Sequence, residues 1–390
     1  MGSHNTIISK EKSFLTNKSI NFHSFLENIK SRFILKRILN NIDKKKLLEI
    51  IKYNKATQSQ LKIYINDYKD YSGKFSKIEI ELIIARNKYG KYINILKEKD
   101  RKYYHIYLNQ RKKEKRHLLI KETEIYNLKK NKIKIVIDKE IKSLYTLFKG
   151  CDCIESISFK KFFRNNIKNM SYMFSGCSCL EEINFLSFNT DKVKDMSFMF
   201  GDCSALKKLN LSNFNTNKVV NMNSMFVNCS SLKELNLSNF NTKNLTMMSG
   251  IFSGCTLLKV LNLSNFNTNK VISMSFAFSG CESLKELNIS NFNTNQVTNM
   301  SDMFSYCSSL KKIDVSNFNT NNVKDMSFMF SNCSSLKELN ISNFNFNKIK
   351  NIQYMFSECT DELKMKIIRQ NEFIGEEAFE DEKNNENYSD

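Results

Sequence analysis

The chain has 390 residues, 41% of them hydrophobic, which is enough apolar content for a folded core and excludes a wholly disordered protein. No run of about 18 apolar residues occurs, so no membrane-spanning helix is expected. The formal net charge of +20 lies mainly in residues 1–140, where 34 Lys and Arg stand against 15 Asp and Glu.

Residues 1–19 are predicted to be flexible and to hold no secretory signal, because MGSHNTIISKEKSF lacks an apolar stretch. The same residues fit the M-G-x-x-x-[ST] pattern for myristoylation of Gly2 and also resemble a cloning remnant; both interpretations stay open. A membrane is therefore expected as a partner only if Gly2 is myristoylated. The missing signal predicts a cytoplasmic protein, and display at the cell surface by an unrecognised route is the alternative.

Residues 20–70 are predicted to form a helical segment. One apolar run has helical spacing and a second begins after Asp43, with Phe33, Leu35, Ile38, Leu39 and Ile42 in the first and Leu47, Leu48, Ile50 and Ile51 in the second. This pattern loosely resembles an F-box, and an F-box followed by leucine-rich repeats implies a ubiquitin-ligase substrate adaptor. The opening Leu-Pro and the closing aromatic residue of that motif are missing, so a helical cap or a dimerisation element is favoured.

Residues 75–140 are predicted to form a small β region that caps the part of the chain that follows. The alternating runs are KIEIELII, KYINIL, YYHIYL and IKIVID. The basic run RKKEKRH at 111–117 has the charge to attract phosphate, nucleic acid or anionic lipid. It contains no stacking aromatic residue, so a solvated hairpin loop is favoured and a nucleic-acid partner is not expected.

Residues of the same type recur every 26 positions through 141–360, and this 26-residue step predicts the fold. In LKELNLSNFN, Leu235 and Leu237 alternate with Asn236 as in a strand, whereas NMSYMF places its apolar residues on one face of a helical turn. One short parallel strand and one short helix per step predict an α/β solenoid of about nine stacked coils. The cysteines that keep the step are Cys151, Cys177, Cys203, Cys229, Cys255, Cys281, Cys307, Cys333 and Cys359.

The phrases MFSGCS, SLKELNLSNFNT and VTNMSDMF resemble the BspA-like leucine-rich repeats, which also occur in protists and as a repeat family of unknown function in mycoplasmas. The resemblance covers somewhat more than half of the chain and implies a leucine-rich-repeat solenoid. For the surface members of that family it implies adhesion, so a surface adhesin of the BspA-like type is an alternative function. Those members carry a signal peptide or a lipobox cysteine, and neither is found in this sequence.

Two rows of the repeat are candidate binding surfaces. The row between the strand leucines is polar, and it fits either a recognition face or a solubilising surface with an asparagine ladder, the second being favoured. Its members are Asn210, Asn236, Asn262, Asn288, Asp314 and Asn340. The row before each Met-Phe pair is rich in aromatic residues, and it is expected either to contact a protein partner or to be covered by a loop. Its aromatic members are Tyr172, Phe198, Phe276, Phe328 and Tyr354.

The cysteines that keep the step are expected to be reduced and buried in a row of small side chains. Cys151 and Cys153 are equivalent to Cys177 and Cys179 in the next coil, so a zinc site and disulfides between coils are the alternatives. Pairs of the C-x-C type in adjacent coils are no known zinc-finger spacing. No metal and no other cofactor is therefore expected.

The last residues, 361–390, are predicted to be an acidic disordered tail that ends in EEAFEDEKNNENYSD. The four histidines all precede the repeats, and the sequence has no glycine-rich phosphate loop or nucleophile elbow, so it predicts no enzyme. It predicts instead a non-enzymatic scaffold for protein–protein interaction. The identity of the protein partner and the oligomeric state do not follow from the sequence.

Overall fold

The computed structural model describes residues 29, 31–39, 44–52, 54–109, 119–120, 131–186, 188–371 and 374–381. The predictions for residues 1–19, for Gly2 and for the basic run at 111–117 lie outside these residues. The chain divides into two compact units, Met1–Gly73 and Lys74–Asp390.

The first unit is helical in its described part, and helices occupy both of the apolar runs of the sequence. These helices are α3 (Arg32–Leu39), α4 (Lys44–Ile51), α5 (Lys55–Leu61) and α6 (Ile65–Phe75), the last of which ends just past the unit boundary. Leu35, Leu39 and Ile51 form a small buried cluster. The side chain of Asn54 accepts a hydrogen bond from the N–H of Thr57 and so caps the start of α5.

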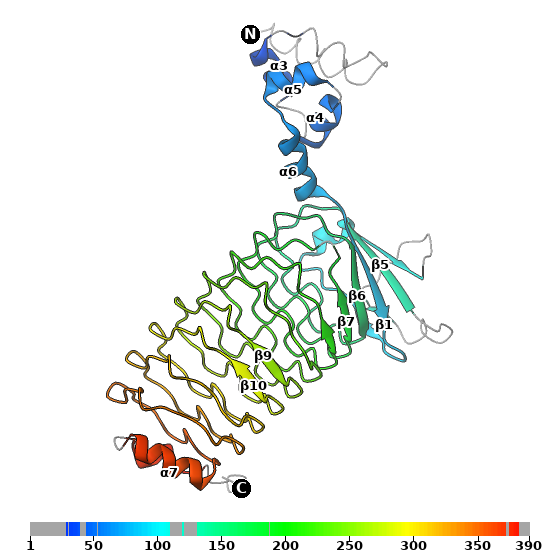
Figure 1. The fold of residues 1–390 in the computed structure, drawn as a ribbon. Coiled ribbons are helices and arrows are strands. Elements are labelled where there is room, and N and C mark those ends of the chain that lie inside the picture. The colour runs from blue at the N-terminus through cyan, green and yellow to red at the C-terminus, as the bar shows by residue number, and fades with distance from the viewer. Residues whose placement is uncertain are drawn as a thin grey trace. The chain divides into compact units, whose positions relative to one another are not determined.

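The second unit begins with a sheet that continues into the repeats (Figure 1). Its strand order is β3-β5-β1-β6-β7-β8, and the strands are β1 (Ile78–Ile84), β3 (Tyr104–Leu108), β5 (Asn131–Ile137), β6 (Ile154–Lys161), β7 (Glu182–Asn184) and β8 (Lys208–Leu209). Strand β1 pairs antiparallel with β5 and β6, whereas β6, β7 and β8 are parallel to one another. The first coil therefore has no open sheet edge, because β1 covers it.

The run KYINIL differs from its prediction as a strand. Only Gly90 and Lys91 form a strand, β2, which pairs with β4 (Leu119–Ile120). The N–H of Asn94 donates to the carbonyl of Leu147 at 2.8 Å, so this segment bonds to the first coil instead of to a sheet. The adjacent residues Tyr92 and Ile93 are both buried in the core, so the segment lacks the alternating burial of a strand.

The short helix predicted for each coil is wrong, since the described residues of 141–360 contain no helix. Consecutive turns replace it. The N–H groups of Tyr172 and Phe174 donate to the next coil, whereas those of Met173 and Ser175 donate to the residue three positions earlier. These stacked turns bury the same side chains as a helical turn, which is why the apolar spacing was misleading.

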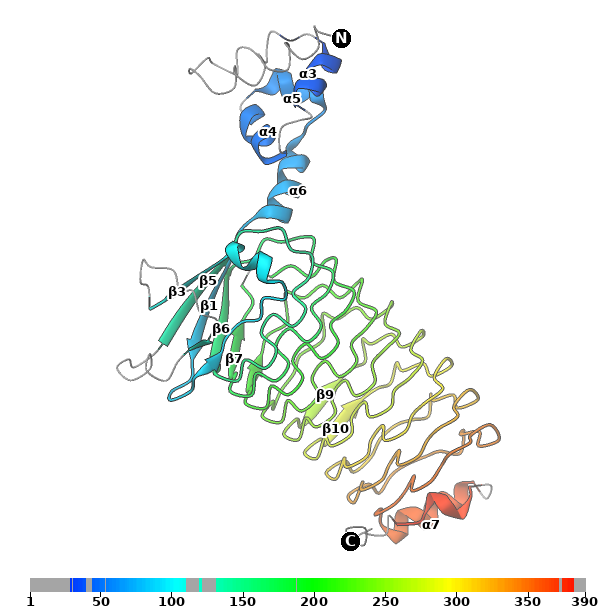
Figure 2. The ribbon, with the colours of Figure 1, turned by 180° about the vertical axis from the view of Figure 1, so that it is seen from behind.

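Parallel pairing links one coil to the next along the solenoid (Figure 2). Besides β6, β7 and β8, strands β9 (Val260–Asn262) and β10 (Glu286–Asn288) pair in parallel. A second line of isolated bridges joins equivalent residues such as Asn221, Met247 and Ser273. The strand alternation is as predicted, because Leu235 and Leu237 are buried while Asn236 is exposed.

Stacked phenylalanines fill the interior of the solenoid. The ring of Phe252 is fully buried and stacks on Phe226 and Phe278, with ring centroids 5.6 and 5.7 Å apart. The thiol of Cys255 donates to the carbonyl of Phe226 at 3.2 Å. Each coil therefore contributes one ring and one thiol to continuous rows, as the 26-residue step predicts.

The phrase NFNT supplies polar side chains that join neighbouring coils. The Oγ1 atom of Thr242 donates to the carbonyl of Asn267 at 3.0 Å and accepts from its N–H at 2.7 Å. The Nδ2 group of Asn265 donates to the carbonyls of Leu237 and Phe240 at 3.0 and 2.9 Å. A buried backbone group without a partner costs about 1–3 kcal/mol, so the recurrence of Asn and Thr follows from the backbone they satisfy.

The prediction of disorder after residue 360 needs correction. Helix α7 (Asp361–Gln370) starts at the cap Thr360 and buries Leu363 and Ile367. The amide of Gln370 accepts from the N–H of Ile341 and donates to the carbonyl of Leu339, so α7 caps the last coil. Beyond it, Phe379 stacks on Phe356 with centroids 5.5 Å apart. The acidic composition concealed these apolar residues, while 382–390 lie outside the described residues.

Candidate protein-binding surfaces

The aromatic row, defined as Tyr172, Phe198, Phe276, Phe328 and Tyr354, occupies one turn position of the repeat. The backbone there is left-handed in every coil, with φ of 56°, 53°, 56°, 57° and 56° for the five residues. Such a conformation costs a residue with a bulky side chain about 1–2 kcal/mol, and glycine avoids that cost. The equivalent positions in other coils hold Ser224, Gly250 and Asp302.

The rings of the aromatic row lie at the surface, outside the buried core. Phe276 is 47% exposed, and the other four are half-buried. Tyr172 and Phe198 stack with centroids 4.7 Å apart, and Phe328 and Tyr354 lie 5.0 Å apart. The row therefore offers one stacked pair and one tilted pair, with Phe276 between them in sequence.

Two further groups extend the aromatic row at its first coils. The ring of Tyr145 meets Tyr172 edge-on at 6.1 Å, and the ammonium group of Lys149 lies 4.7 Å from the centroid of the Tyr172 ring. A cation over a tyrosine face is attracted by the ring quadrupole. This end of the row thus presents an aromatic cluster with one positive charge.

The polar row on the strand face uses its side chains locally. The Oδ1 atoms of Asn236 and Asn262 accept from the N–H of Ser238 and Ser264, each at 3.0 Å, and Asp314 accepts from Ser316 in the same way. The row is exposed from Asn210 to Asn340. It forms no asparagine ladder between coils; that ladder belongs to the row that contains Asn265, three residues after Asn262.

A shallow groove of about 820 Å³ crosses the strand face from β9 to the last coils. Its lining alternates Lys, Glu, Asn and Leu or Ile, and no aromatic side chain contributes to it. Such a surface supplies many hydrogen bonds but no large apolar anchor, and anchors carry most of the energy of protein interfaces.

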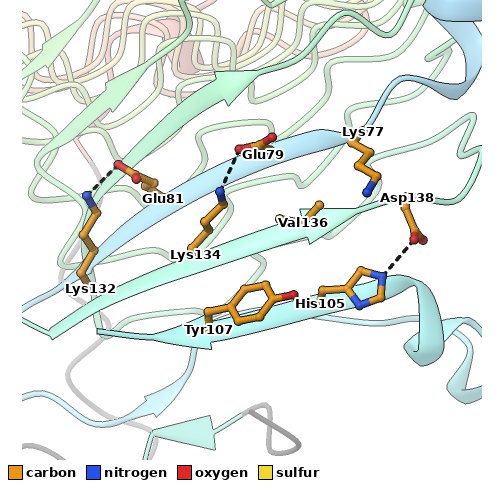
Figure 3. Close-up of a pocket in the computed structure, with 9 residues that line it drawn as sticks. All are labelled: Lys77, Glu79, Glu81, His105, Tyr107, Lys132, Lys134, Val136 and Asp138. Carbon is orange, nitrogen blue, oxygen red and sulfur yellow. Dashed lines mark hydrogen bonds and ion pairs between the residues drawn. The ribbon is translucent and has the colours of Figure 1, made fainter. Parts of the chain in front are cut away.

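The outer face of the capping sheet is a cluster of charges that the sequence analysis did not single out (Figure 3). Lys132 pairs with Glu81 and Lys134 with Glu79, each at 3.0 Å. The hydrogen bonds from Lys161 and Lys134 hold the pKa of Glu79 below its usual range. The alternation of charged and apolar residues in KIEIELII and NKIKIVID was the signal that would have revealed this face.

On the same sheet, the Nε2 atom of His105 lies 2.9 Å from the carboxylate of Asp138, and Tyr107 and Val136 lie beside them (Figure 3). The hollow they line has a volume of about 680 Å³. Because its acids and bases pair with one another, this face resembles a network of ion pairs more than a site in which one group is held ready for proton transfer.

The repeats of this chain match a family of known proteins. A family model described as "Mycoplasma protein of unknown function, DUF285" matches residues 142–260 and 246–367, more than half of the chain. The chain belongs to this family. The prediction of a repeat family that occurs in mycoplasmas is therefore confirmed at this level.

One solved structure similar to this DUF285 protein is described as "Crystal structure of T. pallidum Leucine Rich Repeat protein (TpLRR)". It is 17% identical, the match covers 58% of this chain and 92% of that chain, and the TM-score is 0.29. No curated protein matches the chain.

The cysteines of this DUF285 protein form no disulfides, and all but Cys179 are buried, as predicted for the nine that keep the step. A zinc site was the alternative for the cysteines of the first two coils. There, the thiol of Cys177 donates to the carbonyl of Phe148 at 3.1 Å, and the thiol of Cys153 donates to the carbonyl of Lys91 at 3.2 Å. Within the described residues, no three His, Cys, Asp or Glu side chains group as metal ligands, and no helix is both long and apolar enough to cross a bilayer.

At neutral pH, iodoacetamide should modify Cys179 long before any other cysteine of the folded protein. The reacting species is the thiolate, and burial raises the pKa of Cys255 to about 12, so the buried row provides neither access nor thiolate. Mass spectrometry at increasing times should show one adduct until denaturant is added. Rapid native labelling of Cys203 or Cys255 would show that the row faces solvent.

Proposed function

We propose that this chain is a non-enzymatic scaffold that binds a protein partner through the aromatic row. One observation carries the proposal: five bulky aromatic residues occupy left-handed positions at the surface. Packing of the core does not require these rings, because Ser224, Gly250 and Asp302 fill the same position in other coils. Residues that hold a strained backbone conformation without contributing to core packing are typical of functional sites.

The second row of left-handed positions provides an internal comparison. It lies four residues further on in each coil and holds mainly residues that tolerate this conformation, such as Gly176, Asp202, Asn228 and Gly254. The same backbone demand is therefore met there mainly by glycine, asparagine and aspartate, with Tyr306 and Glu358 as the exceptions. The aromatic content of the first row is thus a separate property of the sequence, and it supports binding because aromatic side chains dominate interface hot spots.

Replacing Phe276 by asparagine should weaken partner binding by about 1–3 kcal/mol, because a ring that anchors an interface would be lost. The same change should leave the thermal midpoint unchanged or raise it, since asparagine tolerates the left-handed backbone better than phenylalanine. Proximity labelling in the native cells identifies the partner, and calorimetry with the purified pair then gives the affinity. Phe328→Asn should behave in the same way.

Asn236→Asp on the polar row is the matched control, and it should change the affinity less than either aromatic variant. A fall in the thermal midpoint of Phe276→Asn without a change in affinity would assign the ring to the core and overturn the proposal. The two alternatives, an F-box-like adaptor and a surface adhesin, remain predictions. Tight binding of residues 1–70 to a Skp-type adaptor would favour the first, and release of repeat peptides by protease from intact cells would favour the second.

A further inference from the structure

One further row of equivalent residues, separate from both left-handed rows, changes its residue type in the middle of the solenoid. The corner row, defined as the residue that precedes each bridge of the line through Asn221, Met247 and Ser273, is lysine at both ends and apolar or threonine between them. Its members are Lys142, Lys168, Lys194, Val220, Thr246, Ile272, Thr298, Lys324 and Lys350. The N–H of Val220 donates to Lys194, that of Thr246 to Val220 and that of Ile272 to Thr246, at 2.9 to 3.3 Å. These side chains therefore lie on consecutive coils.

Three exposed apolar side chains gather at this interruption. Val220 is 38% exposed, Ile272 is 54% exposed, and Met247, which is 49% exposed, pairs in the bridge line with Asn221 and Ser273. We call Val220, Met247 and Ile272 the apolar patch. It spans two coil steps, about 10 Å at the usual strand spacing, which suits one peptide segment.

Met247 takes the place of a residue that normally supports the turn. In the coils around it, Asp195 accepts from the N–H of Ser197 at 2.9 Å, and Asn299 accepts from Ser301 at 2.8 Å. Methionine has no oxygen for this hydrogen bond.

The preceding coil compensates for this loss. The N–H of Ser249 donates at 2.9 Å to the Oδ1 atom of Asn223, which stands where the coils on either side hold Ser197 and Ser249. The N–H of Ser249 is therefore satisfied although Met247 offers no acceptor.

Within the three coils that carry the apolar patch, the nearby charges have one sign. Lys218, Lys243 and Lys270 are exposed and precede the three patch residues by two to four positions. Residues 215–226, 241–252 and 267–278, which form this side of the three coils, contain no Asp or Glu. A partner that covers the patch therefore meets lysines along one edge.

We propose that the apolar patch and these three lysines form a docking site for an acidic amphipathic segment of a protein partner. The proposal rests on the proposed function in that the solenoid binds proteins, but it does not depend on the aromatic row. Apolar side chains of the segment cover Val220, Met247 and Ile272, and its carboxylates face the lysines. A second copy of this surface would bring lysines against lysines, so charge disfavours self-association here.

A random 12-residue peptide library displayed on phage and selected against the full-length protein tests this site. Two variants borrow residues from other coils and so preserve the fold: Val220→Thr/Met247→Asn/Ile272→Thr removes the patch, and Lys218→Asn/Lys243→Asn/Lys270→Gln removes the charge. We expect enriched peptides that carry apolar residues and net negative charge. Synthetic copies should bind the patch variant roughly tenfold or more weakly, and the charge variant should lose the salt dependence of binding.

The proposal is overturned if no peptide prefers the original protein over the patch variant, or if the enriched peptides are neutral or basic. Binding that survives in the patch variant but is lost in Phe276→Asn would keep the proposed function and refute this site. Patch-dependent dimerisation in sedimentation, or patch-dependent binding to anionic phosphatidylserine vesicles in the absence of peptide binding, would assign the patch to a second copy or to a membrane instead.

Discussion

Raising the pH from 8 to about 10.5 should unfold the solenoid, because the unfolded chain releases thiol protons that the folded chain retains. Burial raises the pKa of Cys153 and Cys255 to about 12 and that of Cys359 to about 11. Burial also places the pKa of Cys203, Cys229, Cys281, Cys307 and Cys333 well above the ordinary value.

The sign follows from which state binds more protons. A folded pKa above the unfolded value makes the stabilisation complete below about pH 8.5 and removes it as pH rises towards the folded value. Each such thiol loses about 1.4 kcal/mol of stability per pH unit in this range. Together, the ten buried thiols therefore remove within roughly one pH unit as much stability as a typical domain has in total, about 5–15 kcal/mol.

Urea titrations at pH 8, 9 and 9.5 measure this slope, and Cys203→Ala/Cys229→Ala/Cys255→Ala is the control that isolates the thiols from lysine and tyrosine. The triple variant should lose stability with pH less steeply, by about 2–3 kcal/mol per unit over this range, because the unfolded thiols titrate near pH 8.5. Equal slopes for the two proteins would mean that the thiols are not held protonated by burial.

Phe252→Ala should lower the free energy of unfolding by about 3–5 kcal/mol, because a fully buried ring is replaced by a cavity that stacked coils cannot close. The ring loses its contacts with Phe226 and Phe278 on both sides. Urea denaturation measures the effect. Cys255→Ala, three residues away, should cost about 1 kcal/mol, since it removes one weak hydrogen bond and a small volume. Similar losses for both variants would contradict the stacked core.

The sequence predicted the rows of the solenoid because equivalent residues at a constant step must stack. Phe252, Cys255 and the alternation of Leu235, Asn236 and Leu237 all lie as that step requires. It did not predict the turns at Met170–Phe174, because their N–H groups bond alternately within a coil and to the next coil. Apolar spacing carries no information on such non-local hydrogen bonds, so it mimicked a helix.

The candidate surfaces show a similar limit. The position of Phe276 away from the core followed from its place before the apolar pair Ala277 and Phe278, but its left-handed backbone is visible only in the structure. The apolar patch was visible in the sequence as a break in the lysine positions at Val220 and Ile272. That the turn at Met247 keeps its hydrogen bond was learned only from the contact of Ser249 with Asn223, which a comparison of equivalent residues does not reveal.

Photo-crosslinking from defined positions tests most directly whether the aromatic row binds a protein. Benzoylphenylalanine placed at Phe276 and, separately, at Val260 samples two side chains of similar exposure, 47% and 52%, one in the aromatic row and one on the strand face. In the native cells, irradiation should join the chain to a protein from position 276 and not from position 260. Crosslinks from position 260 alone, or from neither position, would contradict binding through the aromatic row.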